Sequence, residues 1–94
     1  TKHVEAANGI KDRRLRSQWL YDQALTLYLN SSYGHRAVEY AEEAVRLDPS
    51  SSTAHSLLGV CLANTDPRRA QHHLIAAIEL DDSARNWSNL GWFY

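Results

Sequence analysis

Apolar residues recur along this chain mainly at steps of three and four, which is the period of an amphipathic helix. In the first long segment, for example, Leu15, Trp19, Leu25, Tyr28 and Leu29 follow mainly helical spacing. No segment shows the strict two-residue alternation of a half-buried strand. The pattern predicts an all-α chain with helices over about 11–30, 33–47, 52–64, 67–80 and 84–94.

Short polar segments separate these helices and contain residues that favour turns and helix starts. Asn30–Gly34 and Asp48–Ser52 are rich in Asn, Ser, Asp, Gly or Pro. Asp66-Pro67 places an N-cap residue before a proline at the first helical position, and Asp81–Ser83 offers a cap for the last helix. Near the N-terminus, Asn8-Gly9 indicates a turn or a helix end.

The segment 87–94 has the form W-x-x-L-G-x-x-Y, and part of it recurs upstream. Leu90-Gly91 lies 32 residues after Leu58-Gly59, which is the other Leu-Gly pair in the chain. A second pattern, of three small or bulky apolar residues and a turn residue, occurs twice with an offset of 33 residues. Its members are Ala37, Ala41, Ala44 and Pro49, and then Ala70, Leu74, Ala77 and Asp82. The chain therefore contains an internal repeat.

These residues resemble the tetratricopeptide (TPR) repeat, whose period is about 34 residues. The first unit is degenerate: Tyr21 and Tyr28 occupy its aromatic positions, but Ala24-Leu25 stands where Leu-Gly is usual. The resemblance implies a right-handed TPR-type solenoid of antiparallel helix pairs with about two and a half repeats. A generic helical bundle with small residues at its crossings is the alternative. The implied division is a leader at 1–17, repeat 1 at 18–51, repeat 2 at 52–84, and the first helix of repeat 3 at 85–94.

The repeat predicts how its helices pack. Gly59 and Gly91 are expected to allow close approach of the first helix of a repeat to the second. Small residues of the second helix are expected to meet them, and bulky residues to fill the space between packed pairs. The expected small residues are Ala37, Ala44, Ala70 and Ala77, and the expected bulky ones are Tyr28, Leu58, Leu62, Leu74 and Tyr94.

In TPR proteins the first helix of each repeat lines the concave face. Carried over to this chain, the resemblance implies a partner-binding face at Trp19, Asp22, Thr26, Leu29, Thr53, Ser56, Val60, Ala63, Arg85, Ser88 and Trp92. Chaperone-binding members clamp a terminal carboxylate with Lys and Asn. Here Asp22 and Thr26, and then Ser56 and Val60, stand at those places, so the clamp is absent. The groove is neutral and partly apolar, which favours an extended peptide or a packed helix.

A more specific resemblance covers about 19–94. The segments 43–49, 69–75 and 87–94 are similar to the TPR scaffold subunits of the superkiller complex. That family forms long cytoplasmic arrays that assemble a helicase and feed RNA to the exosome. The resemblance implies a non-catalytic, cytoplasmic scaffold for protein–protein interaction, with a role in RNA decay.

Charge and composition narrow the classes of partner. Ten basic and eleven acidic residues give a net charge of −1, so no bulk attraction to nucleic acid or anionic membrane is expected. No apolar run approaches the length of about 18 residues that a membrane span requires. The alternative function is contact with RNA phosphates through the basic cluster Lys11, Arg13, Arg14 and Arg16. The single Cys61 lies in an apolar run and is expected to be a buried small hydrophobe.

Candidate chemistry is sparse, so no enzyme activity, cofactor or metal is expected. His72 and His73 are adjacent and point about 100° apart on a helix, so they cannot chelate one metal together. His3, His35 and His55 have no Cys or acidic partner at ligand spacing. No set of nucleophile, base and orienting group stands out.

The C-terminal end brings three aromatic residues together as Trp92-Phe93-Tyr94, near Trp87 and Leu90. An uncovered cluster of this kind exceeds the apolar patch that monomers usually tolerate. We therefore expect either that further TPR repeats of a longer protein pack on this end, or that the isolated chain self-associates there.

Overall fold

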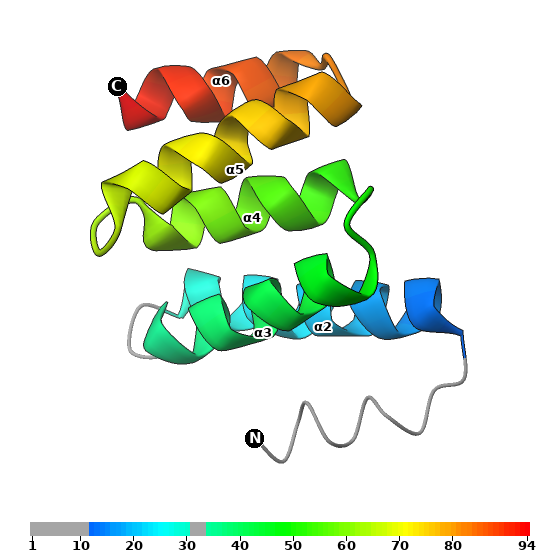
Figure 1. The fold of residues 1–94 in the computed structure, drawn as a ribbon. Helices are drawn as coiled ribbons and strands as arrows, with labels where there is room; N and C mark the ends of the chain where they lie inside the picture. Colours follow the sequence, from blue (N-terminus) through cyan, green and yellow to red (C-terminus); the bar gives the residue numbers. More distant parts are fainter. Residues whose placement is uncertain (1–11, 31–33) are drawn as a thin grey trace.

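The computed structural model describes residues 12–30 and 34–94, and all of its regular elements are α-helices. They are α2 (Arg13–Leu29), α3 (Gly34–Leu47), α4 (Ser52–Leu62), α5 (Pro67–Leu80) and α6 (Ala84–Phe93). The described part contains no strand, so the all-α prediction is confirmed. Successive helices run antiparallel, and the pair α2–α3, the pair α4–α5 and the single helix α6 follow one another along the stack (Figure 1).

Short polar side chains cap the N-termini of four helices. They accept hydrogen bonds from backbone N–H groups that lack helical partners. Asp12 accepts from the N–H of Arg14 at 2.8 Å at the start of α2. Ser51, Asp66 and Ser83 cap α4, α5 and α6 in the same way, which confirms the starts predicted from Asp48–Ser52, Asp66-Pro67 and Asp81–Ser83. The expected features at Asn8-Gly9 and Ser31–Tyr33 lie outside the described residues.

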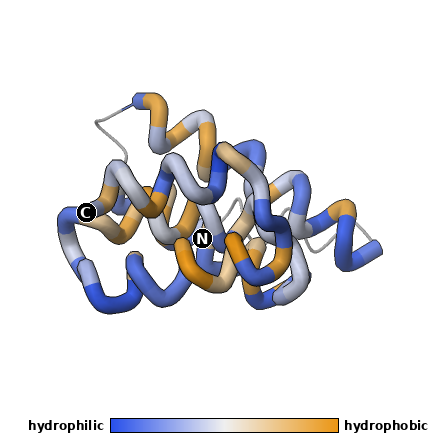
Figure 2. Tube along the Cα trace, turned by 90° about the horizontal axis from the view of Figure 1, so that it is seen from above, coloured by the Kyte–Doolittle hydropathy of each residue, from blue (hydrophilic) through white to orange (hydrophobic). Residues whose placement is uncertain are grey.

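The core forms where the small residues of the repeat pattern meet bulky ones. Ala37, Ala44, Ala70 and Ala77 are all completely buried, and Leu74 is too. Hydrophobic and hydrophilic stretches alternate along the helices (Figure 2), so each helix can turn one face inward and leave the other to water. The burial of these alanines confirms that the repeating small positions are packing positions.

The two Leu-Gly pairs behave differently. A Cβ added to Gly59 would lie 2.6 Å from Cγ of Leu74 and 3.1 Å from the carbonyl oxygen of Ala70, so the expected close approach is present there. A Cβ added to Gly91 would meet nothing within 4 Å. Tyr94, expected to fill a gap between packed pairs, is 76% exposed. Neither expected packing contact is present in the described chain: Gly91 faces open space, and the Tyr94 hydroxyl instead accepts a hydrogen bond from the Gln71 side chain of α5.

A buried polar network joins α6 to the pair α4–α5. The Asn86 side chain is 1% exposed, and its Oδ1 accepts a 2.6 Å hydrogen bond from the Ser56 hydroxyl. Its Nδ2 donates to the hydroxyl of Ser52 and to the carbonyl oxygens of Ala77 and Asp81, at 3.1, 3.2 and 2.8 Å. Because the amide has several partners at fixed positions, the network sets how α6 sits on α4 and α5.

No helix in the described part of the chain is both long enough and apolar enough to cross a membrane.

Candidate functional site

Three adjoining hollows form a continuous trough along α2, α4 and α6. They have volumes of about 450, 220 and 460 Å³. The first and second share Tyr21, Thr53 and Arg85, and the second and third share Tyr28 and Val60. Because neighbouring hollows share these lining residues, the three hollows form one surface.

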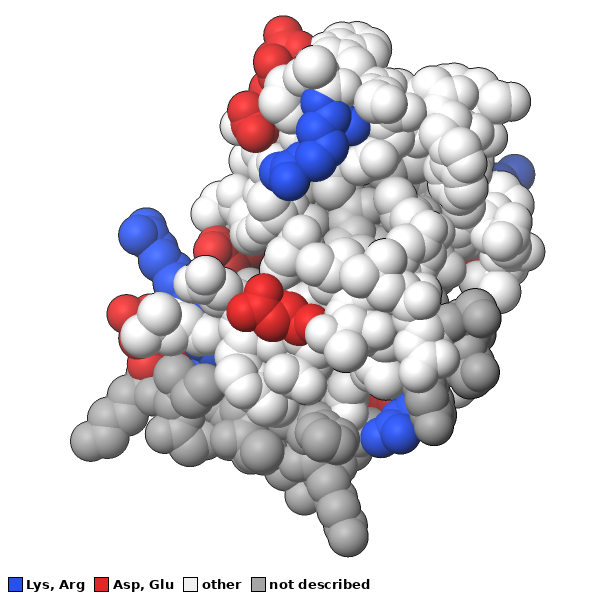
Figure 3. Space-filling view, turned by 180° about the vertical axis from the view of Figure 1, so that it is seen from behind, with Lys and Arg blue, Asp and Glu red and all other residues white. Residues whose placement is uncertain are grey.

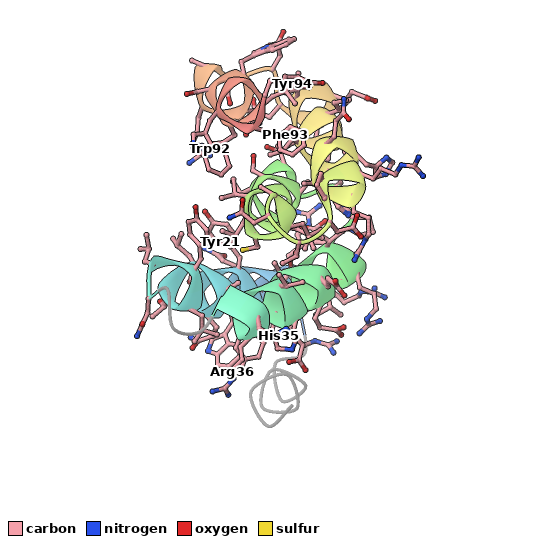
Figure 4. All side chains as sticks on the ribbon, turned by 90° about the vertical axis from the view of Figure 1, so that its left-hand side faces the viewer. Tyr21, His35, Arg36, Trp92, Phe93 and Tyr94 are labelled. Carbon is pink, nitrogen blue, oxygen red and sulfur yellow. The ribbon has the colours of Figure 1, made fainter. Side chains whose placement is uncertain are left out.

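Tyr21 and Trp92 lie on the same side of the helix stack (Figure 4). Figure 3 looks onto that side and shows a mainly uncharged face with scattered acidic and basic groups. The charged side chains of the trough are concentrated in the first hollow, where Arg14 and Arg85 occur together with Asp22 and Asp48. The third hollow is lined mainly by apolar and aromatic side chains, with His35, Asn64 and Thr65 as its polar members. The trough therefore has a polar end of mixed charge and an apolar end.

Six of the eleven residues predicted for partner binding border this trough: Asp22, Thr53, Ser56, Val60, Arg85 and Trp92. Asp22 and Arg85 lie in the first hollow, Val60 lies in the second and third, and Trp92 lies in the third with 61% of its surface exposed. These positions come from three different helices. The structure thus gathers part of the predicted set onto one surface.

The other five predicted residues do not border the trough, and Ser56 serves another role; the five are Trp19, Thr26, Leu29, Ala63 and Ser88. Thr26 lines a separate hollow with Gln23, Leu27, Arg36 and Tyr40, which shares no residue with the trough, and its hydroxyl donates to the carbonyl oxygen of Asp22. Ser56 borders the second hollow but is only 7% exposed, and its hydroxyl is bound to Asn86. Trp19 is half-buried and Ser88 is exposed, and neither borders the trough. The rotation of each helix and the buried network decide which of the predicted side chains reach the surface.

Sequence reasoning missed three large residues of the trough. Tyr21, Leu25 and Tyr28 all line its second hollow from α2. They are separated by four and three residues, so they lie on one helical face. That spacing was visible in the sequence, but the two tyrosines were interpreted as packing positions of the repeat.

The basic cluster proposed for RNA contact is largely engaged within the chain. Nε of Arg13 donates to the carbonyl oxygen of Leu47 at 3.3 Å, and its Nη2 reaches that of Arg46 at 3.4 Å, so Arg13 binds the end of α3. Nε of Arg16 is buried. Arg14 alone borders the trough, and Lys11 lies outside the described residues. A phosphate backbone would therefore meet few available cations here.

Cys61 lies on the wall of the third hollow and is half-buried. Burial raises the pKa of its thiol to about 12. The thiolate is the nucleophilic form, so Cys61 is unreactive near neutral pH. This agrees with the expectation of a small hydrophobic residue.

Three histidines of α4 and α5, none of which lines the trough, meet one another, an arrangement that local spacing did not predict. Nδ1 of His55 on α4 lies 3.0 Å from Nδ1 of His73 on α5, and the ring of His72 packs edge-on against that of His73. Burial lowers the pKa of His73 to about 4, and the charges of His55, His72 and Arg69 contribute in the same direction. Residues 18 apart in sequence are brought together only by the antiparallel packing of their helices.

Within the described ranges, no group of three or more His, Cys, Asp or Glu side chains is close enough to hold a metal ion. Comparisons with protein-family models, curated proteins and solved structures found no match to this chain.

Proposed function

We propose that this chain is a non-catalytic scaffold for protein–protein interaction, built from TPR-type helix pairs of a right-handed solenoid. Its partner is an extended peptide or a helix that lies in the trough along α2, α4 and α6. The observation that carries the proposal is the continuity of the three hollows across three helices. A groove that crosses successive helices suits an elongated ligand better than a compact one.

The chemistry of the trough supports a protein ligand. Half-buried Tyr28 and Val60 and exposed Trp92 line its apolar end, and aromatic side chains are enriched at protein interfaces. At the other end, Arg14 and Arg85 occur together with Asp22 and Asp48. The negative charges of these two carboxylates would repel a polyanion. We infer a peptide with bulky apolar residues near Trp92 and a polar segment near Arg85.

The exposed face of α6 supports the second part of the proposal, that further repeats pack at this end. Trp87 and Tyr94 are 54% and 76% exposed, and Gly91 faces open space. A following helix with small residues would cover these groups. The chain is then one part of a longer array that assembles a cytoplasmic complex, and the more specific resemblance suggests RNA decay as its role.

Site-specific photo-crosslinking tests the trough. A photoreactive amino acid at Val60 is expected to give a discrete adduct with a partner protein, and Tyr28→Arg in the same chain is expected to reduce that adduct at least tenfold. The matched control places the same group at Glu79, which is exposed on α5 and is expected to give no such adduct. Equal crosslinking from both positions would contradict the proposed surface.

RNA titration across a salt series tests the alternative. Phosphate contacts make binding weaken steeply as salt rises. We expect no such salt-dependent binding, and the substitutions Arg14→Glu and Arg85→Glu are expected to leave the RNA titration unchanged. A specific RNA adduct at Val60 in place of a protein adduct would assign the trough to nucleic acid.

A further inference from the structure

We propose that His55 and His73 form a two-imidazole site for a divalent transition-metal ion, which would join α4 to α5. Their Nδ1 atoms face each other across the helix pair at 3.0 Å. The rings are inclined by 29° with centroids 5.2 Å apart, so the two nitrogens lie between the ring centres. Neither histidine lines the trough, so the site does not depend on the function proposed there.

The hydrogen bonds of His55 fix the proton on its ring. Nε2 of His55 lies 2.8 Å from the carbonyl oxygen of Pro49. Because a carbonyl oxygen only accepts, Nε2 carries the hydrogen and Nδ1 of the neutral ring carries a lone pair directed at His73. Metal-binding histidines typically donate their second ring N–H to a backbone carbonyl or carboxylate in this way. His55 is therefore already in the ligand form.

His73 reaches the ligand form by a change of tautomer. In the metal-free pair, its Nδ1–H donates to Nδ1 of His55. When a metal binds, that proton leaves Nδ1 and solvent supplies one to Nε2, so the ring stays neutral and gains a lone pair on Nδ1. Both lone pairs then face one point, and the metal replaces the shared proton.

The movement that metal binding requires is small. With metal–nitrogen bonds of about 2.0–2.1 Å and a tetrahedral angle, the two nitrogens would be about 3.4 Å apart. The present separation of 3.0 Å therefore has to widen by about 0.4 Å, with a turn of each ring. The outer torsion of a histidine side chain is broad, and both rings are only partly buried.

Neighbouring charges and the ligand count define the kind of ion. Arg69 lies close enough to affect His73, but its guanidinium pairs with Glu42 at 3.2 Å, which reduces its repulsion of a cation. Imidazole ligands suit Zn²⁺, Cu²⁺ and Ni²⁺. With two protein ligands, water molecules complete the coordination, so we expect modest affinity and the order Cu²⁺ above Ni²⁺ and Zn²⁺.

Metal titration of the whole chain tests the site, in a background where His3, His35 and His72 are replaced by glutamine. Zn²⁺ or Ni²⁺ binds the folded chain preferentially, so the melting temperature is expected to rise by about 10 °C at a hundredfold excess over Kd. Chelation should reverse the rise. Either His55→Gln or His73→Gln, added to the background, is expected to abolish it.

Electron paramagnetic resonance of Cu²⁺ bound to the background chain provides a second readout that needs no further substitution. Coupling to two imidazoles supports the site, while coupling to one or none overturns it. A thermal shift that persists after His73→Gln, or no saturable shift at all, also overturns it. Circular dichroism in the presence of chelator checks that each variant is folded. If a variant is not folded, the Cu²⁺ resonance spectrum of the background chain decides whether the site exists.

Discussion

The pairs Leu58-Gly59 in α4 and Leu90-Gly91 in α6 have the same sequence but different surroundings. Around Gly59 the Leu74 side chain and the Ala70 carbonyl leave no room for a Cβ, whereas Gly91 meets nothing within 4 Å. Leu58 and Leu90 are both buried. The leucine of the motif is therefore buried in both helices, whereas the glycine is enclosed in α4 and faces open space in α6.

The comparison shows that the repeat motif permits a close contact between two helices but does not by itself produce one. Absence of a Cβ permits a close approach, but a second helix must supply the opposing atoms. In α4 that helix is α5, whose Ala70 and Leu74 meet Gly59. Among the described residues nothing meets Gly91, so α6 depends for its position on contacts with α4 and α5, which include the Asn86 network.

The largest expected effect comes from removing that network. Asn86→Ala leaves the Ser56 hydroxyl and the Asp81 carbonyl without their side-chain partner, and we expect a loss of about 2–3 kcal/mol from the free energy of unfolding. Protection of α6 amides from hydrogen exchange should fall most. Asn89→Ala, on the same helix, is the control and should change stability by less than about 0.5 kcal/mol. Equal effects of the two variants would contradict the role assigned to Asn86.

A matched pair of substitutions tests the two glycines directly. Gly59→Leu overpacks the crossing of α4 and α5 and is expected to cost about 1–3 kcal/mol or more in urea unfolding. Gly91→Leu adds a good helix former in open space, so we expect a neutral effect or a gain of up to about 1 kcal/mol. Similar destabilisation by both would mean that Gly91 is packed in solution, for example by self-association, which sedimentation would reveal.

The smallest effect concerns Cys61, two residues after Gly59 in the packed helix. Its pKa of about 12 keeps the thiol protonated in the folded chain, so alkylation by iodoacetamide at pH 8 should be at least tenfold slower than at Ser88→Cys in a Cys61→Ser chain. Above about pH 9 the unfolded thiol ionises while the folded one does not, so stability should fall as pH rises. Cys61→Ala should remove this contribution, and rapid alkylation of Cys61 would show that the third hollow opens to solvent.

Sequence reasoning succeeded for local features and failed where distant residues meet. Asp66-Pro67 predicted a helix start because the cap involves only neighbouring backbone N–H groups. Spacing along the chain gave His55 no Cys or acidic partner, and it gave no sign that His73 lies beside it. His73 lies 18 residues away, and only the packing of α4 against α5 brings the two rings together.

The trough was predictable in part. The TPR resemblance assigned Asp22, Val60 and Trp92 to the partner-binding face, and these residues do border the trough. Ser56 has comparable helical placement, yet a buried amide from α6 occupies its hydroxyl. Periodicity gives the direction of a side chain from its own helix, but it does not show what the neighbouring helix places opposite.

The sequence by itself determined the five helices of the described residues, most of their caps and the small residues at which they cross, because these depend on local hydrogen bonding and on a helical period. The tertiary structure decided three further matters: which glycine is enclosed, which polar groups are buried together, and where the histidines meet. These depend on the relative placement of whole helices. That placement results from the summed packing of many side chains, so no single segment of the sequence encodes it.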